Sequence, residues 1–157
     1  MRALTEEDAK ATFVNADADE LRVMAFPLGF LLADWDHLDF YAWRDPRTRS
    51  RGYLVAEVDG HLRGVVLRAA DGNGRARSAL CNICHTMQPA DQVSLFTARK
   101  SGAQEGSVGT YICADMSCHE NVRRAMPLAP SEVRASVDKK IDGARHRAQS
   151  FVESVAS

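Results

Sequence analysis

Four cysteines are the residues of this sequence with the most distinctive chemistry. They form two short pairs, Cys81-x2-Cys84 and Cys113-x4-Cys118, with 28 residues between the pairs and no cysteine elsewhere. Two loops that each present two thiolates can close a tetrahedral site around a zinc ion. The spacing is wider than in the common zinc-ribbon pattern. We predict one zinc ion held by Cys81, Cys84, Cys113 and Cys118.

The segments around the cysteines predict how the two pairs are presented. Cys81 and Cys84 fit a tight knuckle after a strand, Cys113 ends a strand, and Cys118 falls in the first turn of the next helix. The positive end of a helix lowers the pKa of a thiol and favours the metal-bound thiolate. A knuckle, a hairpin and then a helix is the order of a treble-clef zinc finger.

A site with four thiolates is closed, so the predicted zinc is structural. Catalytic zinc keeps one position open for water and usually has histidine or carboxylate ligands. His85 and His119 adjoin the ligands, but four thiolates are sufficient, so we place both histidines beside the site. Zinc binding in small domains contributes roughly 10–16 kcal/mol. That matches or exceeds the typical stability of a whole domain, so metal loss is predicted to unfold residues 81–126.

Two other interpretations of the cysteines remain. The cysteines are four unrelated buried thiols in a reducing cytosol, or they include a redox Cys-x-x-Cys pair. A redox pair usually opens a helix in a βαβ unit, and nothing in this sequence suggests such a unit.

Trp35, Asp36, His37 and Asp39 resemble an acid–base cluster, but a helix cap beside aromatic core residues explains them more simply. No serine or histidine belongs to a recognisable nucleophile arrangement. We therefore predict that the protein is not an enzyme.

Charge and hydropathy exclude several classes of protein. The 157 residues include 20 Lys and Arg and 21 Asp and Glu, a net charge of -1. This balance excludes a strongly basic nucleic-acid arm, so no DNA partner is expected. The longest apolar run, 24–33, is shorter than the ~20 residues that cross a bilayer. The first ten residues carry acids where a signal peptide needs an apolar stretch. A cytoplasmic protein with reduced cysteines is expected.

The elements that position the cysteines follow from capping and turn signals. Thr5 and Asp17 begin two short helices that run to about Val14 and Met24, and Pro27 then breaks the pattern. Asp59-Gly60 is a strong hairpin signal between two strand-like runs. The predicted strands are 52–58, 61–68, 78–80, 93–99 and 106–112, followed by a helix capped by Asp115 from Met116 to about Ala125.

The last segment predicts a helix of roughly twenty residues that begins at Ser131. Its apolar stripe is Val133, Val137, Ile141, Ala144, Ala148 and Val152. The fold class is therefore α+β. Short N-terminal helices are predicted to cover an antiparallel sheet made from the 52–68 hairpin, and the finger at about 78–126 to extend that sheet or pack beside it. The amphipathic C-terminal helix is predicted to dock on the sheet. We expect an N-terminal helical segment (1–50) and a zinc-finger part (51–157) in one compact unit.

Several stretches of the sequence together resemble one known family. The stretches are Phe13-Val14-Asn15, Trp35-Asp36-His37-Leu38-Asp39-Phe40, Trp43-Arg44-Asp45-Pro46, Tyr53-Leu54-Val55, Gly64-Val65-Val66-Leu67-Arg68, Cys81-Asn82-Ile83-Cys84-His85, and Val108-Gly109-Thr110-Tyr111-Ile112-Cys113-Ala114-Asp115 followed by Cys118. This pattern, from about residue 10 to 155, resembles the FBP family of elongation factor G-binding proteins, which are related to fusidic-acid-resistance proteins.

The resemblance implies a zinc-containing translation accessory factor that binds elongation factor G and releases it from ribosomes stalled by fusidic acid. In the resistance proteins the treble-clef finger forms much of the contact, and a four-helix bundle precedes it. This chain has room for only two or three short helices there. That departure bears on the resistance activity more than on the binding.

Aromatic residues beside arginines make good interface anchors. The predicted contact residues lie on the strand next to the finger, before the second cysteine pair and on the finger helix: Phe96, Arg99, Lys100, Tyr111, Arg123 and Arg124. Alternatively, Phe96 and Tyr111 pack around the zinc, and Arg123 and Arg124 form a solvated face. The alternative function is RNA or ribosome binding, which the basic residues allow but the net charge disfavours.

Overall fold

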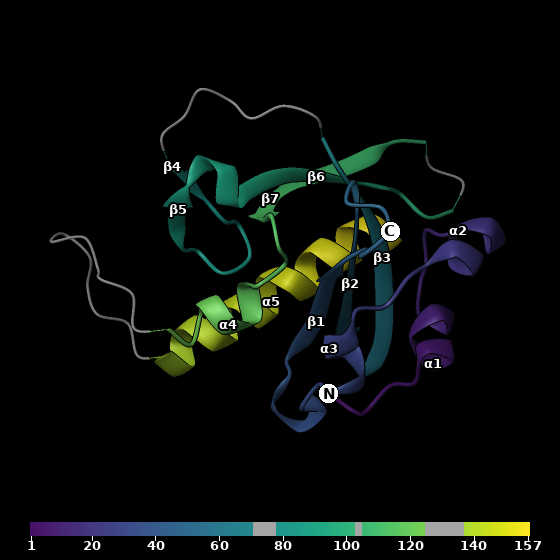
Figure 1. The fold of residues 1–157 in the computed structure, drawn as a ribbon, viewed down its shortest axis with the longest axis horizontal. Coiled ribbons are helices and arrows are strands. Elements are labelled where there is room, and N and C mark those ends of the chain that lie inside the picture. The colour runs from purple at the N-terminus through teal and green to yellow at the C-terminus, as the bar shows by residue number, and fades with distance from the viewer. Residues whose placement is uncertain (71–77, 103–104, 125–136) are drawn as a thin grey trace, which may run out of the picture.

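A five-stranded antiparallel sheet organises the chain (Figure 1). The computed structural model describes residues 1–70, 78–102, 105–124 and 137–157. The elements in order are α1 (Glu6–Ala11), α2 (Ala18–Val23), α3 (Leu28–Leu31), the 3-10 turn η1 (Trp35–His37), β1 (Phe40–Arg44), β2 (Arg51–Val58), β3 (His61–Ala69), β4 (Ser78–Leu80), β5 (Met87–Pro89), the 3-10 turn η2 (Ala90–Gln92), β6 (Val93–Arg99), β7 (Ser107–Cys113), α4 (Cys118–Asn121) and α5 (Val137–Ala156). The sheet order is β1-β2-β3-β6-β7, and β4 pairs with β5 separately. The predicted α+β fold is confirmed.

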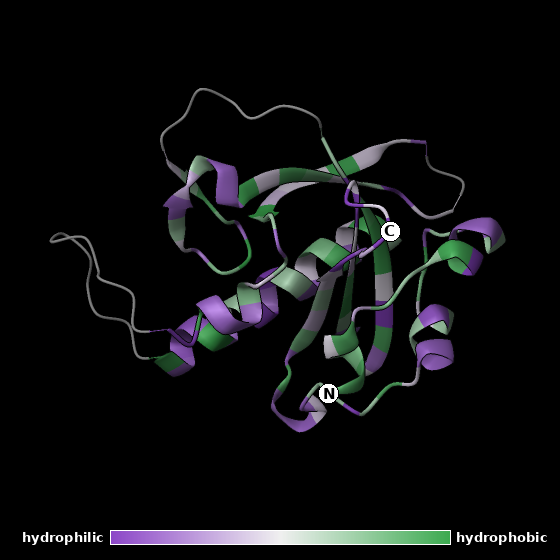
Figure 2. Cartoon of the chain, in the orientation of Figure 1, coloured by the Kyte–Doolittle hydropathy of each residue, from purple (hydrophilic) through white to green (hydrophobic). Residues whose placement is uncertain are grey.

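One face of the sheet packs against α5. Ala144, Ala148 and Val152 of α5 are fully buried and share a core with Leu54 of β2 and Phe96 of β6. Figure 2 shows the helix with alternating hydrophobic and hydrophilic stripes, as its sequence period predicts. The predicted start of this helix at Ser131 and its first apolar position, Val133, lie outside the described residues.

The N-terminal segment covers the opposite face over β1 to β3. Trp43, Tyr53 and Val66 from these strands form a second core with Met24 and Phe30 from the segment. The Phe30 ring lies edge-on to several neighbouring aromatic rings at centroid distances of 4.7–5.5 Å. We call residues 1–38 the N-terminal cover.

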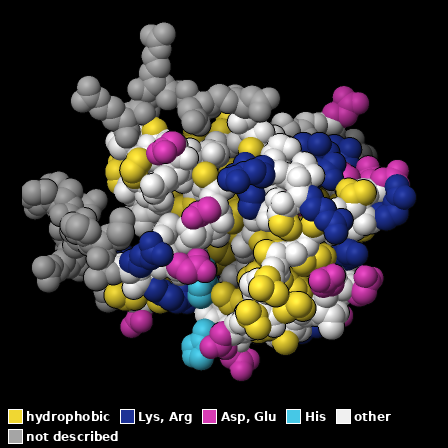
Figure 3. Space-filling view, in the orientation of Figure 1, with side chains coloured by type: hydrophobic (Ala, Val, Ile, Leu, Met, Phe, Trp, Pro, Cys, Tyr) yellow, Lys and Arg dark blue, Asp and Glu magenta, His cyan; other side chains and the backbone are white. Residues whose placement is uncertain are grey.

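The outer surface of the cover is apolar at α3. Leu28, Leu31 and Leu32 are 74%, 70% and 77% exposed. Figure 3 shows hydrophobic side chains gathered over this helix, with acidic side chains at the margins of the cluster. None of the described helices is long and apolar enough to cross a membrane.

The predicted hairpin turn and the two predicted N-terminal helix caps act as expected. Asp59 and Gly60 have φ angles of 51° and 76°, the left-handed geometry of a two-residue hairpin between β2 and β3. Thr5 and Asp17 each form a capping box, with Asp8 and Glu20 as the reciprocal acids. The first helix is shorter than predicted and ends at Ala11, whereas the second ends at Val23 with Met24 as its C-cap, as predicted.

Asn15 fixes the point where β6 diverges from β3. These strands pair through only two residue pairs. Beyond them, the Asn15 side chain accepts from the Val66 N–H at 2.8 Å and donates to the carbonyl oxygens of Val66 at 3.1 Å and Arg99 at 2.9 Å. The buried amide thus satisfies backbone groups of both strands and ties the N-terminal cover to the β6–β7 hairpin.

Asp45 organises the turn between β1 and β2. Its buried carboxylate accepts hydrogen bonds from the Tyr53 hydroxyl at 2.7 Å and from the backbone N–H groups of Ala25, Arg47 and Thr48. Burial opposes ionisation of Asp45, but these donors outweigh it and hold its pKa below the usual 3.8. Asp45 and Pro46 of the Trp-Arg-Asp-Pro stretch therefore lie in the turn that follows β1.

The structure corrects the predicted finger helix. Instead of a helix from Met116, α4 has only the four residues Cys118–Asn121, and the predicted end at Ala125 lies outside the described residues. Met116 has a φ of 61°, which no helical residue adopts. Asp115 does not cap a helix from Met116, because its carboxylate accepts instead from the backbone N–H of Ser117 at 3.1 Å.

Two strands and one α-helix were not predicted. They are β1, β5 and α3. Pro27, predicted to break the helical pattern, is the N-cap residue of α3. β1 pairs with β2 over five residue pairs from Phe40–Ala56 to Arg44–Gly52, so the aromatic stretch around it is part of the sheet.

Candidate metal centre

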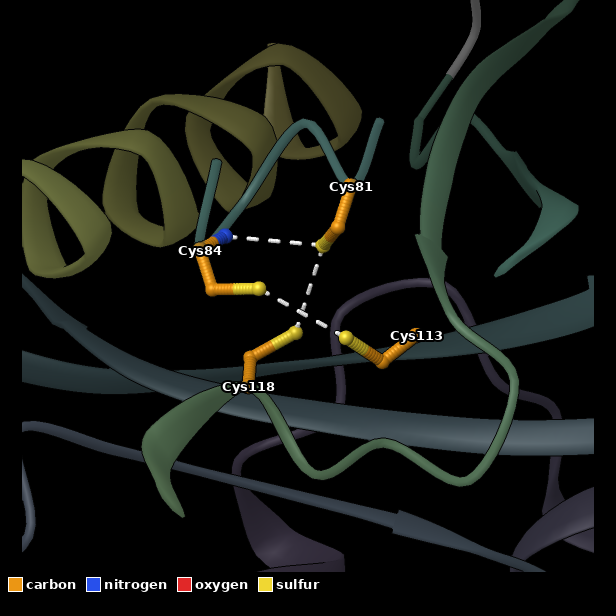
Figure 4. A group of neighbouring side chains, drawn as sticks. All are labelled: Cys81, Cys84, Cys113 and Cys118. Atoms are coloured by element: carbon orange, nitrogen blue, oxygen red, sulfur yellow. Dashed lines mark hydrogen bonds between the residues drawn. The ribbon is translucent and has the colours of Figure 1, made fainter. Parts of the chain in front are cut away.

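The four cysteine sulfurs converge on one point (Figure 4). All four Sγ atoms lie within 4.8 Å of one another, and the Cys81–Cys118 and Cys84–Cys113 pairs are each 3.5 Å apart. A tetrahedral zinc with bonds of about 2.3 Å places its sulfurs about 3.8 Å apart. The donor set therefore fits a single structural zinc ion, as predicted.

The first pair lies in the turn between β4 and β5. Cys81 follows β4, and its sulfur accepts from the Cys84 N–H at 3.4 Å. The turn closes through the His85 N–H to the Cys81 carbonyl at 2.9 Å and through the Cys81 N–H to Thr86 at 3.1 Å. His85 adopts the left-handed conformation, with a φ of 55°. This is the tight knuckle predicted from the spacing.

The second pair joins the end of β7 to α4. Cys113 is the last residue of the strand, and Cys118 is the first residue of the helix. Between them, Met116 turns the chain through its positive φ and packs its side chain over Gly52, where a Cβ would lie 2.3 Å from the methionine methyl. The order of knuckle, hairpin and helix is that of a treble clef.

Neighbouring groups offset the negative charge of the thiolates. Asn121 and Gln88 donate to Cys113 Sγ at 3.3 Å and 3.2 Å, and the Thr86 hydroxyl lies 2.9 Å from Cys84 Sγ. Such donors orient metal ligands and tune their basicity. Zinc bound by four thiolates has no open position, so this centre supplies structure and not Lewis-acid chemistry.

The thiols influence one another because they are buried together. Hydrogen bonds from Cys113 and its neighbours lower the pKa of Cys81, and a hydrogen bond from Cys118 lowers the pKa of Cys113 to about 7. Hydrogen bonds to Cys113, with burial, raise the pKa values of Cys84 and Cys118.

Arg147 of α5 braces the knuckle, a role that the sequence did not predict. Its Nε donates to the carbonyl oxygen of Ile83 at 2.7 Å. Burial lowers the pKa of Arg147, and the nearby charges of Cys84 and Cys81 oppose that shift. The guanidinium also lies over Gly143, where a Cβ would come within 2.7 Å of it. The sequence signal that could have indicated this role is the glycine at 143, one helical turn before Arg147.

The two adjoining histidines stay outside the ligand set. His119 points to η1, where its Nε2 lies 3.0 Å from the His37 carbonyl oxygen, and its ring meets Phe40 edge-on. His85 is exposed. Within the described parts of the chain, the only group that could hold a metal ion is the four cysteines.

The structure separates the six predicted contact residues. Phe96 is completely buried, and the Arg44 guanidinium lies 4.9 Å from its ring centroid. It therefore offers no accessible surface to a partner and packs in the core, which was the alternative prediction for this residue. Arg99 and Tyr111 are exposed, and Lys100, the residue after Arg99, is half-buried.

The two finger arginines differ from each other. Arg123 donates to Asp39 at 2.9 Å and to the carbonyl oxygens of His119 and His37, so it ties α4 to the segment before β1. Arg124 is exposed. Whether any of these residues contacts a partner stays a prediction.

One family model matches the chain. Its description is FBP C-terminal treble-clef zinc-finger, and the match covers residues 8–155. No curated protein and no solved structure gives a significant match.

Proposed function

Because the chain belongs to the FBP C-terminal treble-clef zinc-finger family, we propose that it is a non-catalytic translation accessory factor that binds elongation factor G. The observation that carries the proposal is the family match over nearly the whole chain. The closed zinc centre supports a non-catalytic role, since all four zinc positions are filled by protein sulfur.

The proposed contact is the uncovered side of the β6–β7 hairpin. The cross-strand pairs Leu95–Tyr111, Thr97–Gly109 and Arg99–Ser107 place six side-chain positions on one side, which we call the hairpin face. The N-terminal cover lies on the same side of the sheet but extends only to its border with this face. There Glu20 is 3.6 Å from Arg99. The hairpin face is therefore an exposed sheet surface with an aromatic end and a basic end.

The border of the hairpin face is concave. A hollow of about 220 Å³ lies where α2 meets the sheet, lined by Asn15, Glu20, Val66, Arg68, Thr97, Arg99 and Ser107. Arg68 and Arg99 both pair with Glu20, yet their side chains stay 58% and 64% exposed. Each guanidinium therefore keeps donors that can reach a carboxylate of a partner.

Binding alone suffices for the proposed activity. A protein that binds the free form of elongation factor G more tightly than its ribosome-bound form shifts the population toward release, with no chemical step. The finger supplies the rigid platform that such differential binding needs, and release of elongation factor G from stalled ribosomes is the proposed consequence.

RNA or ribosome binding is the second candidate. The observation that favours it is the placement of exposed Tyr111 on the same face as Arg99, because aromatic and basic groups together bind single-stranded RNA. The net charge of -1 and the pairing of both arginines with Glu20 oppose it. RNA contact would give an affinity that falls steeply with salt.

The test measures binding of the purified zinc-bound protein to elongation factor G at low and moderate salt. We expect a 1:1 complex that survives moderate salt. Replacing two interface anchors, in Tyr111→Ala with Arg99→Ala, should weaken it about 100-fold, since each such anchor contributes more than about tenfold. Leu28→Ala is the matched control, because it removes an exposed side chain on a different surface.

Two outcomes would contradict the proposal. No complex at low salt removes elongation factor G as the partner. A complex with RNA alone that dissociates steeply with salt assigns the hairpin face to RNA. The zinc centre and the fold would stand in either case.

A further inference from the structure

The outer edge of the sheet at β7 is open. Among the described strands, β7 is the last of the sheet and pairs with β6 alone. At the two ends of the hairpin, Lys100 N–H donates to Gly106 and Ala114 N–H donates to Gln92. These bonds turn the even-numbered residues of β7 toward β6, because the ladder bonds of an antiparallel pair alternate. The backbone groups of Ser107, Gly109 and Tyr111 therefore point away from the sheet.

One bond from outside confirms this alternation and marks where the open edge ends. The Asn82 N–H of the zinc knuckle donates to the Tyr111 carbonyl oxygen at 2.7 Å. Among the described residues, no other donor or acceptor reaches this edge. Ser107 and Gly109 are exposed, so within the described part of the chain both present an unpaired N–H and an unpaired C=O to solvent.

The edge lacks the features that usually block strand addition. Natural edge strands carry charged residues, proline or bulges that prevent pairing with another chain. The seven residues of β7, Ser-Val-Gly-Thr-Tyr-Ile-Cys, include no charge and no proline. They pair with β6 in unbroken register from Arg99–Ser107 to Val93–Cys113. The strand is thus a regular template for one more strand.

We propose that the open edge of β7 receives an extended segment of the partner protein as a sixth strand. This rests on the proposed function and specifies its contact: main-chain bonds at Ser107 and Gly109 give affinity, and alternate side chains of the added strand lie on the hairpin face. The segment carries an apolar residue toward Tyr111 and a carboxylate toward Arg99, whose side chain is 64% exposed.

Gly109 provides a matched pair of variants. Its N–H points outward, so Gly109→Pro removes an edge donor and leaves the bonds to β6 intact, and an edge strand tolerates proline at such a position. Gly109→Ala keeps the N–H. A Cβ there meets Leu95 at 3.4 Å and Thr97 at 3.6 Å, ordinary van der Waals contact. Both variants should retain the zinc content and melting temperature of the wild-type protein.

The experiment measures the affinity of the three proteins for elongation factor G, with hydrogen exchange of the β7 amides in the free and bound states. We expect Gly109→Ala to bind like the wild type and Gly109→Pro to bind at least about tenfold more weakly. We also expect exchange at Ser107 and Gly109 to slow on binding.

Equal binding by all three proteins, without protection of Ser107 and Gly109, overturns the strand addition and leaves the proposed function standing. No binding by the wild type overturns the proposed function and this contact with it. A wild-type dimer that Gly109→Pro converts to a monomer assigns the edge to a second copy of this chain and also overturns the proposal.

Discussion

The zinc-finger end of the molecule and its N-terminal cover stabilise the same sheet by different means. At the finger, four buried sulfurs from two short turns converge on one point. At the cover, Phe30, Trp35, Tyr41 and Trp43 pack ring against ring over β1 and β2. The finger thus depends on one metal ion, whereas the cover depends on apolar area spread over many side chains.

The largest expected effect comes from removing the metal. Chelation of zinc, or Cys113→Ser, should unfold the finger over residues 81–126, because zinc binding contributes roughly 10–16 kcal/mol. Both tryptophans, Trp35 and Trp43, lie with the cover. We expect hydrogen exchange to show deprotection of β4, β5 and α4 while tryptophan fluorescence keeps most of its folded signal. Simultaneous loss of both signals would show that the two regions form one cooperative unit.

The cover should respond to cavity formation. Phe30→Ala removes a ring that is 2% exposed and should lower the free energy of unfolding by about 3–5 kcal/mol. Zinc content should be unchanged, since Phe30 does not contact the finger core. Urea unfolding and metal analysis check both parts. The control is Leu28→Ala on the same short helix, expected to change stability by less than about 0.5 kcal/mol.

The Asp45 turn should make the cover sensitive to acid. Hydrogen bonds to the Asp45 carboxylate hold the pKa of Asp45 below 3.8. The ionised carboxylate therefore stabilises the folded state above pH 3.8. This contribution disappears as the pH falls through the lowered pKa. Asp45→Asn should cost about 1–3 kcal/mol at pH 7. The difference between variant and wild type should shrink below pH 4. A difference that is constant with pH would contradict the role of the charge.

The smallest effect is expected where the two regions meet. Arg123→Ala removes the bonds from α4 to Asp39 and to the His37 carbonyl and should cost about 1 kcal/mol, less at high salt, since the pair is partly exposed. Arg124→Ala, one residue along, is the control and should have no measurable effect. Equal losses for both variants would argue against the tie seen at Arg123.

The same contrast explains how far the sequence alone could predict the structure. The zinc ligands and the Asp59-Gly60 hairpin were predictable because both depend on local chemistry with few solutions. β1 was missed because Phe40–Arg44 becomes a strand only by pairing with β2, a contact between segments. The short length of α4 was missed because Asp115 and Met116 form a turn before the helix. The Met116 side chain fits there because Gly52, distant in the sequence, has no Cβ. Phe96 was wrongly included among the contact residues because successive residues of a strand face opposite sides of the sheet. Arg99 and Tyr111 face outward, whereas Phe96 faces the core.

The burial of the cysteines also controls how fast the metal exchanges. Cys81, Cys113 and Cys118 are 0% exposed and Cys84 is 4% exposed, so a chelator in solution cannot reach the sulfur cluster while the finger is closed. Zinc release then follows local opening of the finger, and its rate should level off at high chelator concentration. We therefore expect such a finger to keep its metal through brief periods of zinc shortage, because the lifetime of the closed state would set the pace of loss.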